Sequence, residues 1–171
     1  ITNLIPSLKL INFPPSRTHD LLSWIQSEED QQFWSGNTFQ EGLNTEVFSI
    51  HLQRKDLHSF AFIDENGLLN CYGEIVHSVG NKEVLCRVIV NPTIRRRGIG
   101  RKFVHKIVDW CVAQKKFMRI TLNTFGHNKP ARNCYRSLGF NEIALKEKYR
   151  RVGPHWRDLV VMEKSLNIER I

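Results

Sequence analysis

Apolar positions recur along the chain at two different spacings, and the spacing separates helices from strands. In the second half, apolar side chains return every four residues, at Ile99, Phe103, Ile107 and Cys111. This period predicts an amphipathic helix that begins after Gly98 and ends near residues 115–116. A further helix is expected over residues 128–138, because Asn128 is a good N-cap and Gly139 a good stop signal.

Segments rich in β-branched and aromatic residues, bounded by turn residues, predict strands. They are residues 8–12, 59–63, 68–76, 83–90, 118–123, 140–146 and 159–163. Turns at residues 64–67 and 80–81 join three of them, which indicates an antiparallel meander. The last two strands are expected to flank a turn at residues 150–153.

The first third of the chain is less periodic. Helices are expected at residues 18–27 and 45–55, and the polar, glycine-containing stretch 27–42 is expected to be a loop. The whole order predicts an α+β (mixed α/β) fold with one β-α-β unit in its middle. No linker divides the sequence, so residues 1–171 are expected to form a single domain.

Composition narrows the class of protein. The 171 residues include 25 Lys+Arg and 17 Asp+Glu, a net charge of +8, and 41% are hydrophobic, which is ordinary for a globular domain. No apolar run approaches the roughly 18 residues of a membrane span, and no signal-peptide pattern opens the sequence. The four cysteines are widely spaced, so we expect free thiols, a cytoplasmic protein and no metal site. The basic excess favours a polyanionic partner without identifying it.

The most informative segment is a strand, a turn and a helix. The strand Val88-Ile89-Val90 leads through a short turn into Arg95-Arg96-Arg97-Gly98-Ile99-Gly100-Arg101, where the long helix begins. Unpaired backbone N–H groups, the positive end of the helix dipole and adjacent arginines together make a site for a pyrophosphate. Glycine at positions 98 and 100 lets a phosphate approach the main chain closely.

Two better-known phosphate motifs do not match this turn. A dinucleotide fingerprint needs a third glycine at position 103, where the chain has Phe103, and a P-loop needs a Gly-Lys pair that the sequence lacks. On glycine spacing alone, a solvated basic turn with no ligand is as good an interpretation as a phosphate site.

Residues further along the chain carry a family resemblance. Arg95-Arg96-Arg97-Gly98-Ile99-Gly100 matches the pattern Q/R-x-x-G-x-G/A, and Asn128 is followed by Tyr135 and by Leu138-Gly139-Phe140. In both motifs the chain resembles the GNAT superfamily of acyl-CoA-dependent N-acetyltransferases, near its bacterial ribosomal-protein N-acetyltransferases. The resemblance implies a splayed, mostly antiparallel central sheet with helices on both faces, and acetyl-CoA as co-substrate.

The resemblance also implies roles for individual residues. Val88, Ile89 and Val90 would pair with the pantetheine arm of acetyl-CoA like an added strand. Arg96, Arg97, Gly98, Ile99, Gly100 and Arg101 would form the pyrophosphate loop. Asn128 would bond the pantetheine arm. Tyr135 would act as the general acid that protonates the departing CoA thiolate, because a phenol near pKa 10 can donate to it.

The general base is harder to assign. Related enzymes that acetylate ribosomal-protein termini carry a Glu where this chain has Asn123, which cannot act as a base. Glu74 is the best remaining carboxylate, although an exposed strand residue without function is an equally good interpretation. His77, His127 and an ordered water are further candidates for taking the proton.

The acceptor is left open as a small-molecule or protein amine, with Phe33, Trp34 and Trp156 as candidate pocket aromatics. We expect direct transfer in a ternary complex, because the cysteines fall in segments expected to be packed. A non-catalytic acyl-CoA sensor is the alternative function. A nucleic-acid partner is disfavoured because no reader motif accompanies the arginines. No membrane partner is expected, and a monomer and a homodimer are equally compatible with the sequence.

Overall fold

A computed structural model of the protein describes residues 7–166 and contains one seven-stranded sheet. The strands are β1 (Leu8–Asn12), β2 (Leu57–Asp64), β3 (Leu69–Ser78), β4 (Lys82–Val90), β5 (Arg119–Phe125), β6 (Asn141–Val152) and β7 (His155–Ser165). Their order across the sheet is β1-β2-β3-β4-β5-β7-β6. Only β4 and β5 are parallel, which confirms the predicted mostly antiparallel sheet.

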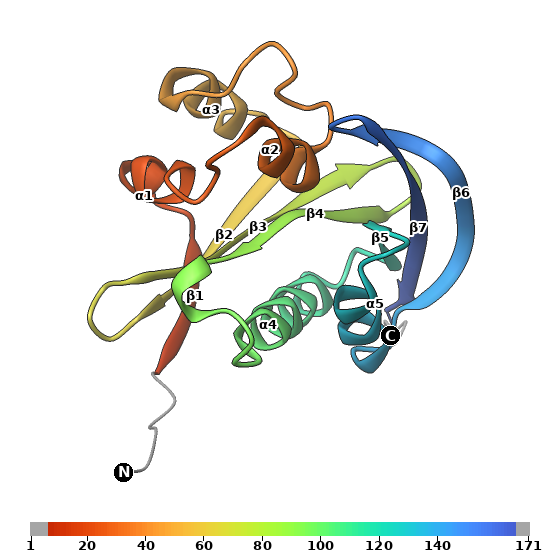
Figure 1. The fold of residues 1–171 in the computed structure, drawn as a ribbon. Coiled ribbons are helices and arrows are strands. Elements are labelled where there is room, and N and C mark those ends of the chain that lie inside the picture. Colours follow the sequence, from red (N-terminus) through yellow and green to blue (C-terminus); the bar gives the residue numbers. More distant parts are fainter. Residues whose placement is uncertain (1–6, 167–171) are drawn as a thin grey trace.

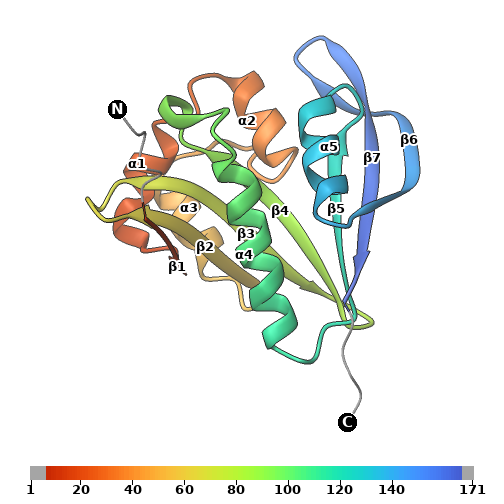
Figure 2. The same ribbon diagram turned by 90° about the horizontal axis from the view of Figure 1, so that it is seen from below.

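Helices cover both faces of the sheet, as predicted (Figures 1 and 2). On one face lie α1 (Thr18–Leu22), α2 (Glu28–Ser35) and α3 (Thr45–Leu52), and on the other lie α4 (Ile99–Ala113) and α5 (Lys129–Ser137). Short 3₁₀ turns, Pro15–Arg17 and Pro92–Ile94, precede α1 and α4. Each face has its own apolar core, one centred on Phe103 and Ile107 of α4 and one on Phe48 and Tyr72.

The predicted helix after Gly98 is confirmed as α4. Its four apolar residues at intervals of four are all buried, with at most 4% of their surface exposed. Burying this face against β2, β3 and β4 is what stabilises the helix, because propensity alone rarely holds a helix of 15 residues. The helix that Asn128 was predicted to cap is confirmed as α5.

The sheet opens in its middle, between β4 and β5. These strands pair only over Lys82–Val84 and Arg119–Thr121, and then diverge (Figure 2). A bulge in β4 accompanies the opening, because Cys86 pairs with Glu74 but Ile89 pairs with Tyr72, which leaves two residues of β4 opposite Gly73. Arg87 takes φ +51 at this bulge. From Leu85 onward, the β5-facing edge of β4 has no strand partner within residues 7–166.

Three expectations about the elements were wrong in extent. The predicted loop 27–42 contains α2, which Ser27 caps by accepting a hydrogen bond of 3.0 Å from the N–H of Asp30. The helix expected over residues 18–27 ends at Leu22. The last two strands are longer than predicted and form a hairpin whose turn lies at residues 153–154. Among the described helices, none has the length and apolar character needed to span a bilayer.

Candidate active site

The opening between β4 and β5 forms the floor of a cavity of about 750 Å³. Its walls come from α2 and the turn that follows it, from α5, and from the β6–β7 hairpin. Because the two central strands separate here, main-chain groups of β4 face the cavity rather than another strand. A ligand with its own amide groups therefore finds an unused strand edge at this place.

Helix α5 carries two of the predicted site residues into this cavity. Asn128 and Tyr135 both line it, since they lie two helical turns apart on one side of α5. The Asn128 side-chain oxygen also caps the helix by accepting a 3.2 Å hydrogen bond from the N–H of Ala131. Asn128 thus fixes where α5 begins and, with it, where Tyr135 lies.

Tyr135 is held in an apolar setting. Its ring packs edge-on against Phe140, with centroids 5.9 Å apart. Burial raises the pKa of Tyr135 well above its usual value, and the neighbouring Cys134 thiol adds to the shift. No hydrogen bond from another residue of the 7–166 segment engages its hydroxyl. The side chain therefore stays protonated at neutral pH and is available to donate into the cavity.

The predicted cofactor strand lies partly in the cavity wall. Val88 lines the cavity, and Ile89 and Val90 continue the same strand beyond it towards α4. The carbonyl of Val90 accepts a 3.2 Å hydrogen bond from the Arg95 Nε–H, which draws the following turn against the end of β4.

The predicted pyrophosphate turn lies outside the cavity, at the exposed N-terminus of α4. Gly98 is the N-cap with φ +74, a conformation that a residue with a Cβ adopts only with strain. A Cβ at Gly100 would lie 3.1 Å from a methyl group of Val90, so glycine there lets α4 pack closely on β4. The guanidinium of Arg101 bonds to Ser137 of α5. Its main-chain N–H lies in the first turn of α4, where no helical partner takes it, and is available to a ligand.

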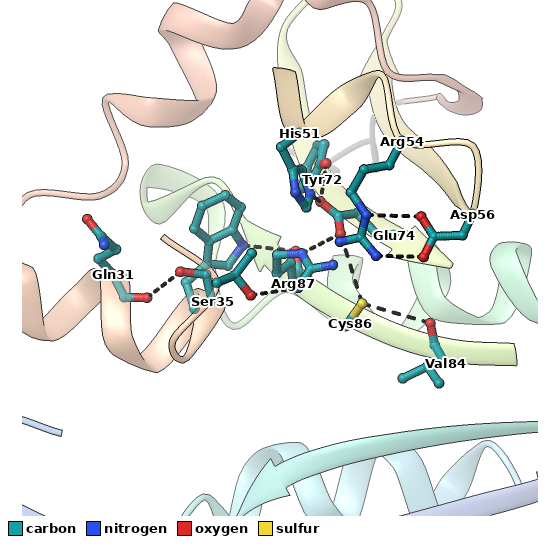
Figure 3. A network of polar contacts seen from close by, with 12 residues as sticks. Gln31, Ser35, His51, Arg54, Asp56, Tyr72, Glu74, Val84, Cys86 and Arg87 are labelled. Atoms are coloured by element: carbon teal, nitrogen blue, oxygen red, sulfur yellow. Dashed lines mark hydrogen bonds and ion pairs between the residues drawn. The ribbon is translucent and has the colours of Figure 1, made fainter. Parts of the chain in front are cut away.

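Glu74, the candidate base, does not face the cavity. The carboxylate is fully buried and accepts hydrogen bonds from Tyr72 Oη (2.5 Å), from His51 Nε2 (2.8 Å) and from Arg87 (Figure 3). Arg87 and Cys86 line the cavity, and Glu74 lies behind them. We therefore correct the expectation that Glu74 flanks the cleft as a base. The geometry of Glu74 suits a residue that holds Arg87 in place.

The other polar side chains considered for taking the amine proton are engaged, misplaced or of the wrong type. Asn123 lines the cavity, as its place in the sequence suggested, but it is an amide. His77 lines the cavity and bonds through Nδ1 to the buried Glu83 at 2.5 Å. His127 packs against the rings of Phe33 and Phe125, 5.8 Å between centroids in each case. Asp56 accepts two hydrogen bonds from Arg54, which lower its pKa.

Sequence reasoning missed three arginines of this cavity, Arg54, Arg87 and Arg150. Arg87 stands in an otherwise apolar strand, and its positive φ at the bulge leaves no pattern in the sequence. Phe33 and Trp34 do line the cavity as predicted, and the Trp34 Nε1–H donates to the carbonyl of Arg87 at 2.9 Å. Trp156 does not line it and is 59% exposed.

Residues 19–140 match the acetyltransferase (GNAT) family. The chain belongs to this family. The match includes the turn before α4, Asn128 and Tyr135, and it confirms the sequence-based prediction that the protein is an acetyltransferase enzyme with the GNAT fold.

Individual relatives are more distant. The chain is 27% identical over 94 residues to the [ribosomal protein bS18]-alanine N-acetyltransferase of Salmonella typhimurium, covering 55% of this chain and 63% of that protein. It is 22% identical over 135 residues to the Escherichia coli K12 protein of the same name, covering 79% and 82%. The predicted nearness to this group of enzymes is thereby confirmed.

Solved structures share the fold. Spermidine N-acetyltransferase from Vibrio cholerae, in complex with CoA and spermine, superposes with a TM-score of 0.81 at 15% identity, covering 94% of this chain and 96% of that one. The ribosomal-protein-S18-alanine N-acetyltransferase of Escherichia coli gives 0.75 at 16% identity, covering 96% and 99%. At such identities the likeness establishes the fold alone.

Proposed function

We propose that the protein, as a single domain, transfers the acetyl group of acetyl-CoA to a primary amine, directly, within a ternary complex. One observation carries the proposal: Asn128, Tyr135 and the free edge of β4 share one cavity. The pantetheine arm would pair with Val88–Val90, as a peptide pairs with a sheet edge. The pyrophosphate would bind the N–H groups at the start of α4, with Arg96 and Arg97 supplying positive charge.

Tyr135 supplies the proton for the leaving thiolate. Transfer breaks the C–S bond of acetyl-CoA and forms a C–N bond, so the sulfur must gain a proton while the amine loses one. Tyr135 is protonated at neutral pH and donates its proton to the thiolate formed within the same cavity, and the phenolate left behind regains a proton from water before the next turnover. The amine proton passes to water, since the cavity's carboxylate, Asp56, is bound by Arg54.

Direct transfer is favoured over an acetyl-cysteine route. Cys86 lines the cavity, but burial raises the pKa of its thiol to about 12. The thiolate is the nucleophile in such chemistry, and at neutral pH almost none of it would form. The sensor alternative predicts acetyl-CoA binding without transfer, and Tyr135 in the cavity argues against it.

Two classes of acceptor follow from the named relatives. Some carry the name of a ribosomal-protein alanine acetyltransferase, and the Vibrio cholerae enzyme is named for spermidine. The proposal therefore includes both a protein amine and a small amine as possible classes of acceptor.

A thermal-shift titration with acetyl-CoA, followed by thiol release against a panel of amines and peptides, tests the proposal. Acetyl-CoA at 100 times its dissociation constant should stabilise the protein by about 2.7 kcal/mol. Thiol release with an amine supports the transferase. Binding without release from any amine would support the sensor, and absence of binding would overturn the assignment of the α4 turn.

A further inference from the structure

Arg150 stands at the wall of the cavity that lies opposite the α4 turn. It belongs to β6, is half-buried, and lines the cavity together with Phe33 and Trp34 of α2. Its guanidinium lies against Gly36, where an added Cβ would collide with it. The glycine that ends α2 therefore leaves room for this guanidinium beside the cavity.

Arg150 differs from the other arginines of the cavity in having no acidic partner. Arg54 makes a two-bonded pair with Asp56, at 3.0 and 2.7 Å, and Arg87 is paired with the buried Glu74. Within residues 7–166, no carboxylate lies within 4.0 Å of the Arg150 guanidinium nitrogens. The positive charge of the cavity that is not balanced by a neighbouring carboxylate is thus centred on β6.

A second arginine reinforces this charge. Arg157 of β7 is the direct cross-strand partner of Arg150, so both side chains project from the same face of the hairpin. Like charges placed opposite each other destabilise a sheet. The Nε of Arg157 is buried and, among the described residues, has no hydrogen-bond partner.

The acidic groups of the neighbouring elements do not neutralise the pair. The Glu29 carboxylate of α2 lies beside Gly153, 3.6 Å from the position that a Cβ added at Gly153 would take. Within the described structure, Glu29 forms no ion pair with either arginine. Asp158, next to Arg157 in β7, accepts a 2.7 Å hydrogen bond from the N–H of Lys148.

We infer that the acceptor carries a carboxylate near its amine, and that Arg150 binds this carboxylate. The inference rests on the proposed function and names its substrate class. A guanidinium fork matches a carboxylate with two parallel hydrogen bonds, and the arginine pair loses its repulsion when an anion lies beside it. A free amino acid meets this requirement, as does a short peptide with an acidic side chain, whereas a polyamine brings further positive charge to the same wall.

Pairs of acceptors with and without the carboxylate test the inference, with rates compared per neutral amine because amidation of an amino acid also lowers the pKa of its amine. Acetyl-CoA binding and thiol release are measured first, with L-amino acids, their amides, spermidine, and peptides Ala-Ala-Glu-Ala and Ala-Ala-Gln-Ala as amides. Removing a charge-assisted bond to arginine should lower kcat/KM by about 10–100-fold for the neutral member of a pair. A preference among the amino acids identifies a small acceptor, and one confined to the peptides identifies an acidic peptide.

Variants locate the effect. Arg150→Gln should raise KM for the carboxylated acceptor by a similar factor, leave the KM of its amide unchanged, and leave acetyl-CoA affinity unchanged. Arg151→Gln is the matched control, because this exposed neighbour bonds the carbonyl of Gly153 and does not line the cavity. Arg151→Gln should melt near the wild-type temperature, and Arg150→Gln at or slightly above it, because it relieves the repulsion with Arg157.

Equal rates for acids and amides would overturn the inference, and so would spermidine as the best acceptor. An Arg150→Gln variant that affects acids and amides equally does so too. These results are distinguishable from failure of the proposed function, in which acetyl-CoA does not bind or no amine releases thiol.

Discussion

The two ends of the cavity are held by contacts of different range along the chain. The end that would take the cofactor is built from β4, α4, β5 and α5, consecutive elements between Lys82 and Ser137. The opposite end, where we place the acceptor and which we call the acceptor end, joins α2 to the β6–β7 hairpin. There the N–H of Gly153 donates to the side chain of Gln32, 121 residues away, at 2.8 Å. Trp34 reaches Arg87 across 53 residues.

This difference determines which residues at each end can change without disturbing the other end. The cofactor end depends on glycines, a helix start and a cap, each of which has a local backbone reason. The acceptor end depends on which side chains two distant segments bring together, so its charge can change without disturbing the strand edge or the α4 turn. Such a division would let enzymes that share a cofactor differ in the acceptor that they bind.

The largest expected effect separates chemistry from cofactor binding. Tyr135→Phe should lower kcat by about 10²–10⁴-fold, because the leaving thiolate loses its proton donor. Acetyl-CoA affinity should be retained, since the ring still packs on Phe140. Single-turnover kinetics with a thermal-shift titration measure both. Unchanged single-turnover rates would remove Tyr135 from the mechanism.

The same tyrosine makes a prediction about pH. Its raised pKa keeps it protonated through the alkaline range. At pH values up to about 10, deprotonation of Tyr135 should therefore not reduce the rate. The rate should instead rise with pH as the acceptor amine deprotonates. A pH profile of kcat/KM measured from 6 to 10 checks this, and a descending limb that Tyr135→Phe abolishes within that range would contradict it.

The next largest effect concerns the ion pair between Glu74 and Arg87, which supports the bulge in β4. Glu74→Gln leaves the guanidinium of Arg87, with only 10% of its side chain exposed, without its counter-charge. Breaking a buried pair from one side costs about 3–5 kcal/mol, whereas Glu74→Gln with Arg87→Gln should recover part of the loss. Denaturant unfolding measures both variants.

Activity of the folded Glu74→Gln fraction then distinguishes a positioning role from a base. A positioning residue leaves the pH profile with its original shape, whereas loss of a base flattens the rise with pH. A flattened profile would restore Glu74 as the base.

Sequence reasoning succeeded where the signal is local. The period of four in α4 and the Asn128 cap of α5 are written in consecutive residues, and both were confirmed. Helix α2 was missed because Gly36 suggested a loop, although Ser27 followed by Asp30 is a recognised helix start. The burial of Glu74 had no local signal, because it depends on Arg87 turning back at a bulge 13 residues away.

A smaller effect tests the cofactor end alone, with a glycine elsewhere as its control. Gly98→Ala and Gly67→Ala both place a Cβ in open space at similar positive φ, +74 and +77. Both should lose about 1–2 kcal/mol of stability from strain. Only Gly98→Ala should also weaken acetyl-CoA binding, measured by calorimetry. Equal affinity in the two variants would mean that the phosphates do not approach this turn.

The smallest effect concerns a contact between α5, at the cofactor end, and the β6–β7 hairpin. Glu142 of β6 accepts hydrogen bonds from Arg132 (2.7 Å) and Arg136 (2.6 Å) of α5, and the Arg132 bond in particular lowers the pKa of this carboxyl. A lowered pKa means that the stabilisation is complete above the unfolded value near 4.3 and is lost as the pH falls through the folded value. Wild type should therefore melt slightly above Glu142→Gln at pH 7, and this difference should shrink as the pH falls below the unfolded value near 4.3.

The acetyl-CoA affinity of the same variant decides how independent the two ends are. Glu142 is partly exposed, so solvent screens its ion pairs and the loss in melting temperature should be small. Acetyl-CoA affinity should not change, because α5 keeps its Asn128 cap. A fall in acetyl-CoA affinity in Glu142→Gln would mean that the β6–β7 hairpin sets the position of α5, and the cofactor end would then depend on the same long-range contacts as the acceptor end.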